Sequence, residues 1–186
     1  MESSTEMPLA TLIAYAVAAL ITLIAAVTDV RSQRIPNWLT LPALLLAPVV
    51  YGVAFSWSGL AGSLFGLFAC GLLPYLAFRK GGMAGGDVKL FAAIGAVTGV
   101  AVGIEAEFYA VIAAGIFALL QLAIRGKLLR TLGSTFYVGM NPVLPKKWRR
   151  RITPEMMTRI RLGAPIFVGT MVAIGLRTPL STWGIS

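Results

Sequence analysis

One stretch near the middle of the chain sets the pattern for the rest: Gly81-Gly82-Met83-Ala84-Gly85-Gly86-Asp87-Val88-Lys89-Leu90. Its small residues expose the backbone and place a carboxylate at the start of a long apolar segment. A charged side chain at membrane depth costs roughly 2.5–3.5 kcal/mol on insertion scales, and by default it marks a functional site. The only other aspartate, Asp29, also lies at the end of an apolar segment. The two aspartates are therefore the first candidates for chemistry.

The composition is that of a membrane protein. The 186 residues are 58% hydrophobic and only 12% charged, and their mean hydropathy is +0.83, well above that of soluble domains. We expect residues 1–186 to form a single membrane-embedded domain. The residues before the first apolar run include Glu2 and Glu6 and no basic residue, unlike a cleaved signal peptide, so we expect that run to remain in the mature protein.

The residue types limit the possible chemistry. The chain has no histidine and one cysteine, Cys70, within an apolar run. This excludes Ser-His and Cys-His catalysis, zinc clusters of cysteine and histidine, and disulfides within the chain. Carboxylate, hydroxyl or lysine chemistry remains, and we expect no metal site and no cofactor.

Apolar runs long enough to cross a bilayer, which takes roughly 17–25 helical residues, predict an all-α, polytopic bundle of six transmembrane helices. The predicted spans are 8–28, 39–56, 58–78, 88–104, 107–124 and 162–178. So few residues join the second and third spans, Phe55-Ser56-Trp57-Ser58, that we expect a tight hairpin there.

The basic residues predict the orientation of this bundle, because short cytoplasmic loops are rich in Lys and Arg. Of the 16 Lys and Arg, all but Arg177 fall in or beside the first, third and fifth loops. Both termini are therefore expected outside, both aspartates at the cytoplasmic face, and the turn at Glu105–Glu107 outside.

The fifth loop, at about 125–161, is the one sizeable stretch expected outside the membrane. It contains Lys146-Lys147-Trp148-Arg149-Arg150-Arg151, and Thr153-Pro154-Glu155 predicts the start of a short helix. Positive charge beside an interfacial aromatic residue is typical of a segment resting on an anionic lipid leaflet. We interpret the net charge of +9 in the same way and expect no nucleic-acid partner.

Glycines recur at helical spacing within two predicted spans. Gly95, Gly99 and Gly103 lie four residues apart in the fourth, as do Gly62 and Gly66 in the third. Small residues on one face let helices approach closely. The pattern predicts ordinary helix packing, with a groove for a substrate helix as the functional alternative.

Two carboxyl groups brought close together can share one proton. One then acts as a base that activates water against a peptide carbonyl, while the other donates a proton. Taken singly, Asp87 could merely cap the fourth span and Asp29 could be a boundary residue. Helix dipoles predict that Asp87, before the start of a helix, ionises before Asp29, which follows the end of one.

Two segments resemble signatures of the prepilin peptidases (type IV leader peptidases), a family of intramembrane-type aspartic proteases. The first segment resembles the family's aspartate followed by Ile-Pro-Asn; it is Asp29-Val30-Arg31-Ser32-Gln33-Arg34-Ile35-Pro36-Asn37-Trp38-Leu39-Thr40. Similar to its Gly-x-Gly-Asp-x-Lys motif is Gly82-Met83-Ala84-Gly85-Gly86-Asp87-Val88-Lys89-Leu90, in which Ala84 stands at the first glycine. The small-and-proline motif that opens the family's last helix resembles Leu162-Gly163-Ala164-Pro165-Ile166.

The resemblance implies that Asp29 and Asp87 are the catalytic pair, with support from Gly85, Gly86, Lys89, Pro36 and Asn37. Lys89 would either neutralise charge at the pair or extend to the lipid headgroups. Asn37 would either cap the second span or hold its loop near the aspartates.

By the same resemblance, the substrate is a prepilin, whose basic leader is cut on the cytoplasmic side just before its hydrophobic helix. The expected location is the cytoplasmic (inner) membrane of a prokaryote. The chain lacks the four-cysteine zinc domain of the longer family members, so no methyltransferase activity is expected. This compact form resembles the peptidases of tight-adherence (Flp) pilus systems and the preflagellin peptidases.

Two other classes of function compete with the peptidase. A proton-coupled transporter or channel subunit would use the two aspartates as a proton relay. A catalytically inactive assembly subunit would keep the helices without needing both acids. Against the transporter, both aspartates are expected near one face of the membrane, and no inverted repeat is visible.

Overall fold

The computed structural model describes residues 8–124 and 162–178, and all of its regular structure there is helical. The helices are α1 (Leu9–Ser32), α2 (Asn37–Arg79), α3 (Gly85–Thr98), α4 (Val100–Ile124) and α6 (Gly163–Arg177). The chain divides into two compact units, 1–113 with 161–186 and 114–160. The described part of the second unit is the end of α4, and the candidate site described below belongs to the first unit. The predicted loop at 125–161 and its short helix lie outside the described residues.

The all-helical prediction is confirmed within this part of the chain, but the count of six membrane-crossing helices is not. Three described helices are long and apolar enough to cross a bilayer: α1, α2 and Val100–Gln121 of α4. With 14 residues, α3 extends only about 21 Å, against a hydrocarbon thickness of about 30 Å. α6 has 15 residues and is similarly short.

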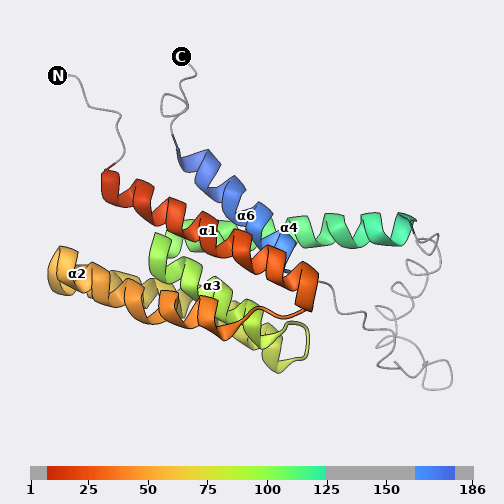
Figure 1. Ribbon diagram of the computed structural model, residues 1–186, viewed down its shortest axis with the longest axis horizontal. Helices are drawn as coiled ribbons and strands as arrows, with labels where there is room; N and C mark the ends of the chain where they lie inside the picture. The colour runs from red at the N-terminus through yellow and green to blue at the C-terminus, as the bar shows by residue number, and fades with distance from the viewer. Residues whose placement is uncertain (1–7, 125–161, 179–186) are drawn as a thin grey trace, which may run out of the picture. The chain divides into compact units, whose positions relative to one another are not determined.

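The second and third predicted spans form one element, α2, which is broken where the sequence predicts a hairpin. Phe55 and Ser56 have non-helical backbone angles, with φ 58° and ψ −151° at Ser56. A β-carbon added to Gly52 would lie 3.4 Å from the β-carbon of Leu60, so the residues on either side of the break face each other. The chain therefore reverses direction inside α2 (Figure 1).

Contacts with α3 confirm this reversal. The Tyr51 hydroxyl donates to the Val97 carbonyl at 2.7 Å, and the Ser63 hydroxyl donates to the Ala96 carbonyl at 2.8 Å. Twelve residues of straight helix would separate Tyr51 and Ser63 by about 18 Å, yet they bond to consecutive carbonyls. Both halves of α2 thus contact the end of α3.

The fourth and fifth predicted spans meet at a different place from the one expected. Gly99 ends α3 with φ +83°, a conformation that favours glycine. Glu105 and Glu107, expected in an outward turn, lie inside α4. Glu105 forms a bidentate ion pair with Arg177 of α6, at 2.6 and 2.8 Å. Hydropathy alone could not locate a one-residue turn within a continuous apolar run.

The glycine pattern serves mainly close helix packing. A β-carbon added to Gly66 would collide with the backbone carbonyl of Gly95, and one added to Gly95 would collide with that of Gly66. A β-carbon added to Gly103 of α4 would likewise collide with the Cys70 sulfur. Close packing thus depends on glycine at Gly66, Gly95 and Gly103, as the packing interpretation predicts. At Gly62 and Gly99 an added β-carbon would meet no atom within 4 Å, so the prediction holds for only part of the pattern.

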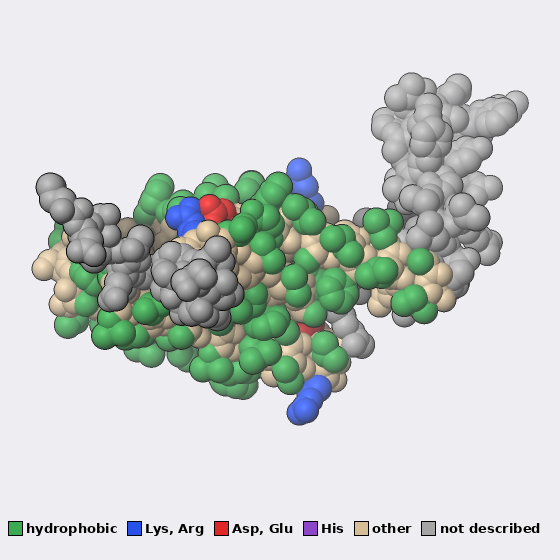
Figure 2. Space-filling model, turned by 90° about the horizontal axis from the view of Figure 1, so that it is seen from above, with side chains coloured by type: hydrophobic (Ala, Val, Ile, Leu, Met, Phe, Trp, Pro, Cys, Tyr) green, Lys and Arg blue, Asp and Glu red, His purple; other side chains and the backbone are tan. Residues whose placement is uncertain are grey.

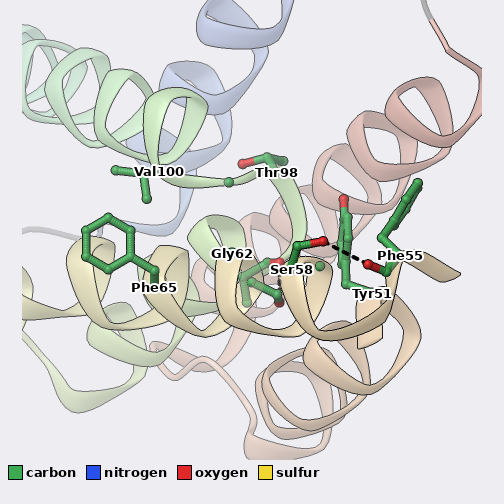
Figure 3. A pocket seen from close by; sticks show the side chains of 11 residues that line it. Tyr51, Phe55, Ser58, Gly62, Phe65, Thr98 and Val100 are labelled. Carbon is green, nitrogen blue, oxygen red and sulfur yellow. Dashed lines mark hydrogen bonds between the residues drawn. The ribbon is translucent and has the colours of Figure 1, made fainter. Parts of the chain in front are cut away.

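A cavity of about 530 Å³ opens beside the break in α2 and the turn at Gly99. Its lining includes Tyr51, Phe65, Thr98 and Val100 (Figure 3). It adjoins the end of α3 where the chain turns into α4, at the opposite end of α3 from Asp87.

The surface of the helices is apolar. Large side chains such as Val53, Phe65, Phe68 and Phe108 are more than half exposed, and hydrophobic side chains cover most of the helical surface seen in Figure 2. Exposure of this extent suits contact with lipid rather than water.

Candidate active site

Asp29 belongs to the last turn of α1, which extends four residues beyond the predicted end of the first span. Its side chain is only 7% exposed. The helix ends at Gln33, whose φ is +56° and whose N–H donates to the Asp29 carbonyl at 2.9 Å. Asp29 is thus held within a regular helix rather than on the loop that follows it.

Asp87 is the third residue of α3 and is 6% exposed. Its Oδ2 accepts a hydrogen bond of 3.2 Å from the backbone N–H of Ala84, the residue that precedes the helix. Ala84 has φ −87° and ψ 151°, which any residue adopts. Alanine therefore fits where the family motif has its first glycine, and the left-handed backbone of this loop lies at Gly81, with φ +77°.

A third helix reaches Asp29 from a distant part of the sequence. The backbone N–H of Gly163, the first residue of α6, donates to Asp29 Oδ2 at 3.0 Å. A β-carbon added to Gly163 would lie 2.6 Å from the β-carbon of Asp29. Glycine at this position lets the start of α6, where free N–H groups favour negative charge, approach the carboxylate.

The two carboxyl groups are close enough to influence each other. The pKa of Asp87 is raised to about 6 as the net result of three causes: burial raises it most, the hydrogen bond from Ala84 lowers it, and the negative charge of Asp29 raises it. The net direction is opposite to that predicted from the helix dipole alone. Burial outweighs the favourable position of Asp87 at the start of α3, because desolvation penalises the charged form.

The supporting residues of the two motifs meet at the same end of α2 and α3. Lys89 Nζ donates to Asn37 Oδ1 at 2.8 Å. Pro36 is extended and directly precedes α2, so Asn37 is the first residue of that helix. Asn37 therefore joins its segment to the one that carries Asp87.

The two glycines before Asp87 differ in their surroundings. A β-carbon on Gly86 would lie 3.0 Å from that of Ile35, tighter than an ordinary contact. On Gly85 the nearest atom would be a ring carbon of Phe78 at 3.6 Å, which leaves room for a methyl group. Gly86 is thus the glycine that lets the two motif segments approach.

Comparison with known proteins bears directly on these two segments. Residues 16–119 match the type IV leader peptidase family. This protein belongs to that family. The matched region includes both aspartates, and it includes Asn37 and Lys89.

A curated relative is also similar over part of its length. The chain is 35% identical over 98 residues to the protein called prepilin leader peptidase/N-methyltransferase of Bacillus subtilis (strain 168). The aligned region covers 51% of this chain and 39% of the relative, so the chain matches well under half of the relative's length. No solved structure matches the chain.

Gly163 contacts Asp29, a partner that the sequence motifs did not predict. It lies outside the matched region, 134 residues from its partner Asp29. The available signal was the small-and-proline motif at the start of the last helix. That motif indicated a helix start, but nothing local to it pointed to a carboxylate.

The residues described offer no obvious metal site. Among them no group of three or more His, Cys, Asp or Glu side chains lies close enough to hold a metal ion. The arrangement does provide two buried carboxyl groups, each accepting one backbone N–H, which suits the sharing of a proton.

Proposed function

We propose that this protein is a membrane aspartic endopeptidase that removes the leader peptide of type IV prepilin-like proteins. The observation that carries the proposal is the pair of buried carboxyl groups, one from each motif segment, of which one raises the pKa of the other. Family membership supports the prepilin-like substrate.

In this mechanism the pair works with one proton between its two carboxyl groups. Burial and the negative charge of Asp29 raise the pKa of Asp87, which favours Asp87 as the group that holds the shared proton in the free enzyme. Asp29 belongs to α1 and accepts the hydrogen bond from the start of α6. It is then the carboxylate that takes a proton from the attacking water. Asp87 donates its own proton to the peptide oxygen or to the departing amine. These roles are the reverse of those that the helix dipoles predict.

The proposal places the site at the cytoplasmic face of the inner membrane of a prokaryote, with both termini outside. The basic residues flanking both motifs support this orientation, and the same basic residues would contact anionic lipid. The basic leader of the substrate would approach the site from the cytoplasm, and its hydrophobic helix would approach from the bilayer. Because these 186 residues contain a single cysteine, buried Cys70, the proposal includes no N-methylation.

A proton-coupled transporter is less well supported by the positions of the acids. Asp29 lies in the last turn of α1 and Asp87 in the first turn of α3. Relay groups of transporters lie near the middle of the membrane. The described residues therefore favour a peptidase.

The test is co-expression with a prepilin and measurement of its cleavage. Asp29→Asn and Asp87→Asn should each abolish processing while the protein stays in the membrane at normal level. Glu107→Gln is the matched control, because Glu107 is an acid buried to a similar extent, on α4 outside both motifs. Normal processing by either aspartate variant would overturn the proposal.

A further inference from the structure

Thr40 is a buried hydroxyl without a partner. Its side chain is 1% exposed, and its Oγ1 makes no hydrogen bond in the described structure. Five other threonines in or directly after a helix bond to a carbonyl of the preceding turn: Thr22, Thr28, Thr98, Thr170 and Thr178. A buried hydroxyl left unpaired destabilises a fold, so each instance calls for an explanation.

The direction of Thr40 follows from its neighbour on the helix. Asn37 and Thr40 lie three residues apart in α2 and therefore share a face. Asn37 accepts its hydrogen bond from Lys89, so that face is turned toward α3. Thr40 thus faces the helix that carries Asp87.

The depth of Thr40 follows from two contacts between the first half of α2 and α3. Gly86 packs on Ile35 near the start of both helices, and Tyr51 bonds to Val97 near the end of α3. The two elements therefore run in the same direction. Thr40 lies near the beginning of α2, and Asp87, which immediately follows Gly86, lies near the beginning of α3. The two residues are therefore at the same end of the contact between these helices.

We propose that Thr40 is a positioning residue for Asp87. Its hydroxyl donates a hydrogen bond to the Asp87 carboxyl group, directly after a side-chain rotation or through one water molecule. The bond fixes the orientation of the carboxyl group and stabilises its ionised form. This role rests on the proposed peptidase function, in which Asp87 exchanges a proton during each turnover.

The test compares Thr40→Val, which keeps the shape and removes the hydroxyl, with Thr40→Ser, which keeps the hydroxyl. Valine should lower kcat/KM for prepilin cleavage about tenfold and move the alkaline limb of the pH profile upward by about one unit. Serine should restore both. Thr170→Val is the matched control, since Thr170 is 0% exposed and bonds within its own helix, to the Ile166 carbonyl.

Thermal unfolding in detergent separates positioning from a merely structural role. Loss of the one hydrogen bond that the proposal gives Thr40 should lower the stability of Thr40→Val by no more than about 1 kcal/mol. A less active variant that still folds, with a shifted pH profile, supports the proposal. An active Thr40→Val with an unshifted profile overturns it and leaves the peptidase assignment intact, provided Asp87→Asn is inactive.

A second readout does not depend on cleavage. Isotope-edited infrared titration of the Asp87 carboxyl group should give a higher pKa in Thr40→Val than in wild type, because a bond to the ionised form is lost. An unchanged pKa of Asp87 would overturn the role of Thr40 even if no prepilin were cleaved.

Discussion

The two ends of α3 use polar groups for different purposes. At its start, Asp87 and Lys89 interact with groups of the other motif segment, and α6 brings Gly163 to Asp29. At its end, the hydroxyls of Tyr51 and Ser63 bond to carbonyls that the turn at Gly99 leaves without helical donors. We call these the motif end and the hairpin end. In the proposed mechanism the acids at the first end exchange protons, whereas hydroxyls at the second complete the backbone hydrogen bonding.

The largest expected effect belongs to the motif end and concerns the pair as a unit. Asp29→Asn or Asp87→Asn should lower prepilin cleavage about a thousandfold or more, and the double variant should lower it no further. Rates of single-turnover cleavage in detergent would measure this. Additive losses in the double variant would contradict a shared proton.

A smaller effect is expected from the contact between α6 and Asp29. Gly163→Ala should lower cleavage about tenfold to a hundredfold, because its β-carbon would lie 2.6 Å from that of Asp29 and displace the N–H donor. Gly175→Ala is the matched control in the same helix, since no atom lies within 4 Å of its added β-carbon. Equal cleavage by the two variants would show that α6 does not help to place Asp29.

The titration of Asp87 tests the closeness of the two acids without any substrate. The negative charge of Asp29 raises the pKa of Asp87, so Asp29→Asn should lower that pKa from its value of about 6. In the wild type, kcat/KM should fall on the alkaline side as Asp87 loses its proton. Infrared titration of Asp87 in both proteins would detect the change. A pKa of Asp87 that is unaltered by the substitution would mean that the two carboxyl groups do not interact.

The smallest effect is expected at the hairpin end. Tyr51→Phe removes the hydrogen bond to the Val97 carbonyl and should cost about 1 kcal/mol of stability. Cleavage should stay within about twofold of wild type if the two ends have separate roles. Thermal unfolding and cleavage measured on the same preparation would check this. A large loss of cleavage at unchanged stability would show that the hairpin end contributes to catalysis.

Local sequence patterns were enough to predict several features of this fold. Apolar runs predicted helices, and the short linker at residues 55–58 predicted the break that the structure has at Phe55 and Ser56. The spacing of glycines in the two spans predicted close packing, which the structure has at Gly66, Gly95 and Gly103 but not at Gly62 or Gly99. The turn at Gly99 was missed because the residues around it are as apolar as the helices they join.

The sequence by itself determined that this is an apolar protein, helical throughout the regular structure of its described residues, with two aspartates in family motifs, since hydropathy and motif spacing are local properties. Only the tertiary structure decided what surrounds those aspartates. The donor to Asp29 comes from Gly163, 134 residues away, and the pKa of Asp87 is raised because helix packing removes its carboxyl group from solvent. Burial and contacts between distant segments arise from packing, and packing outweighs the local helix dipole at Asp87.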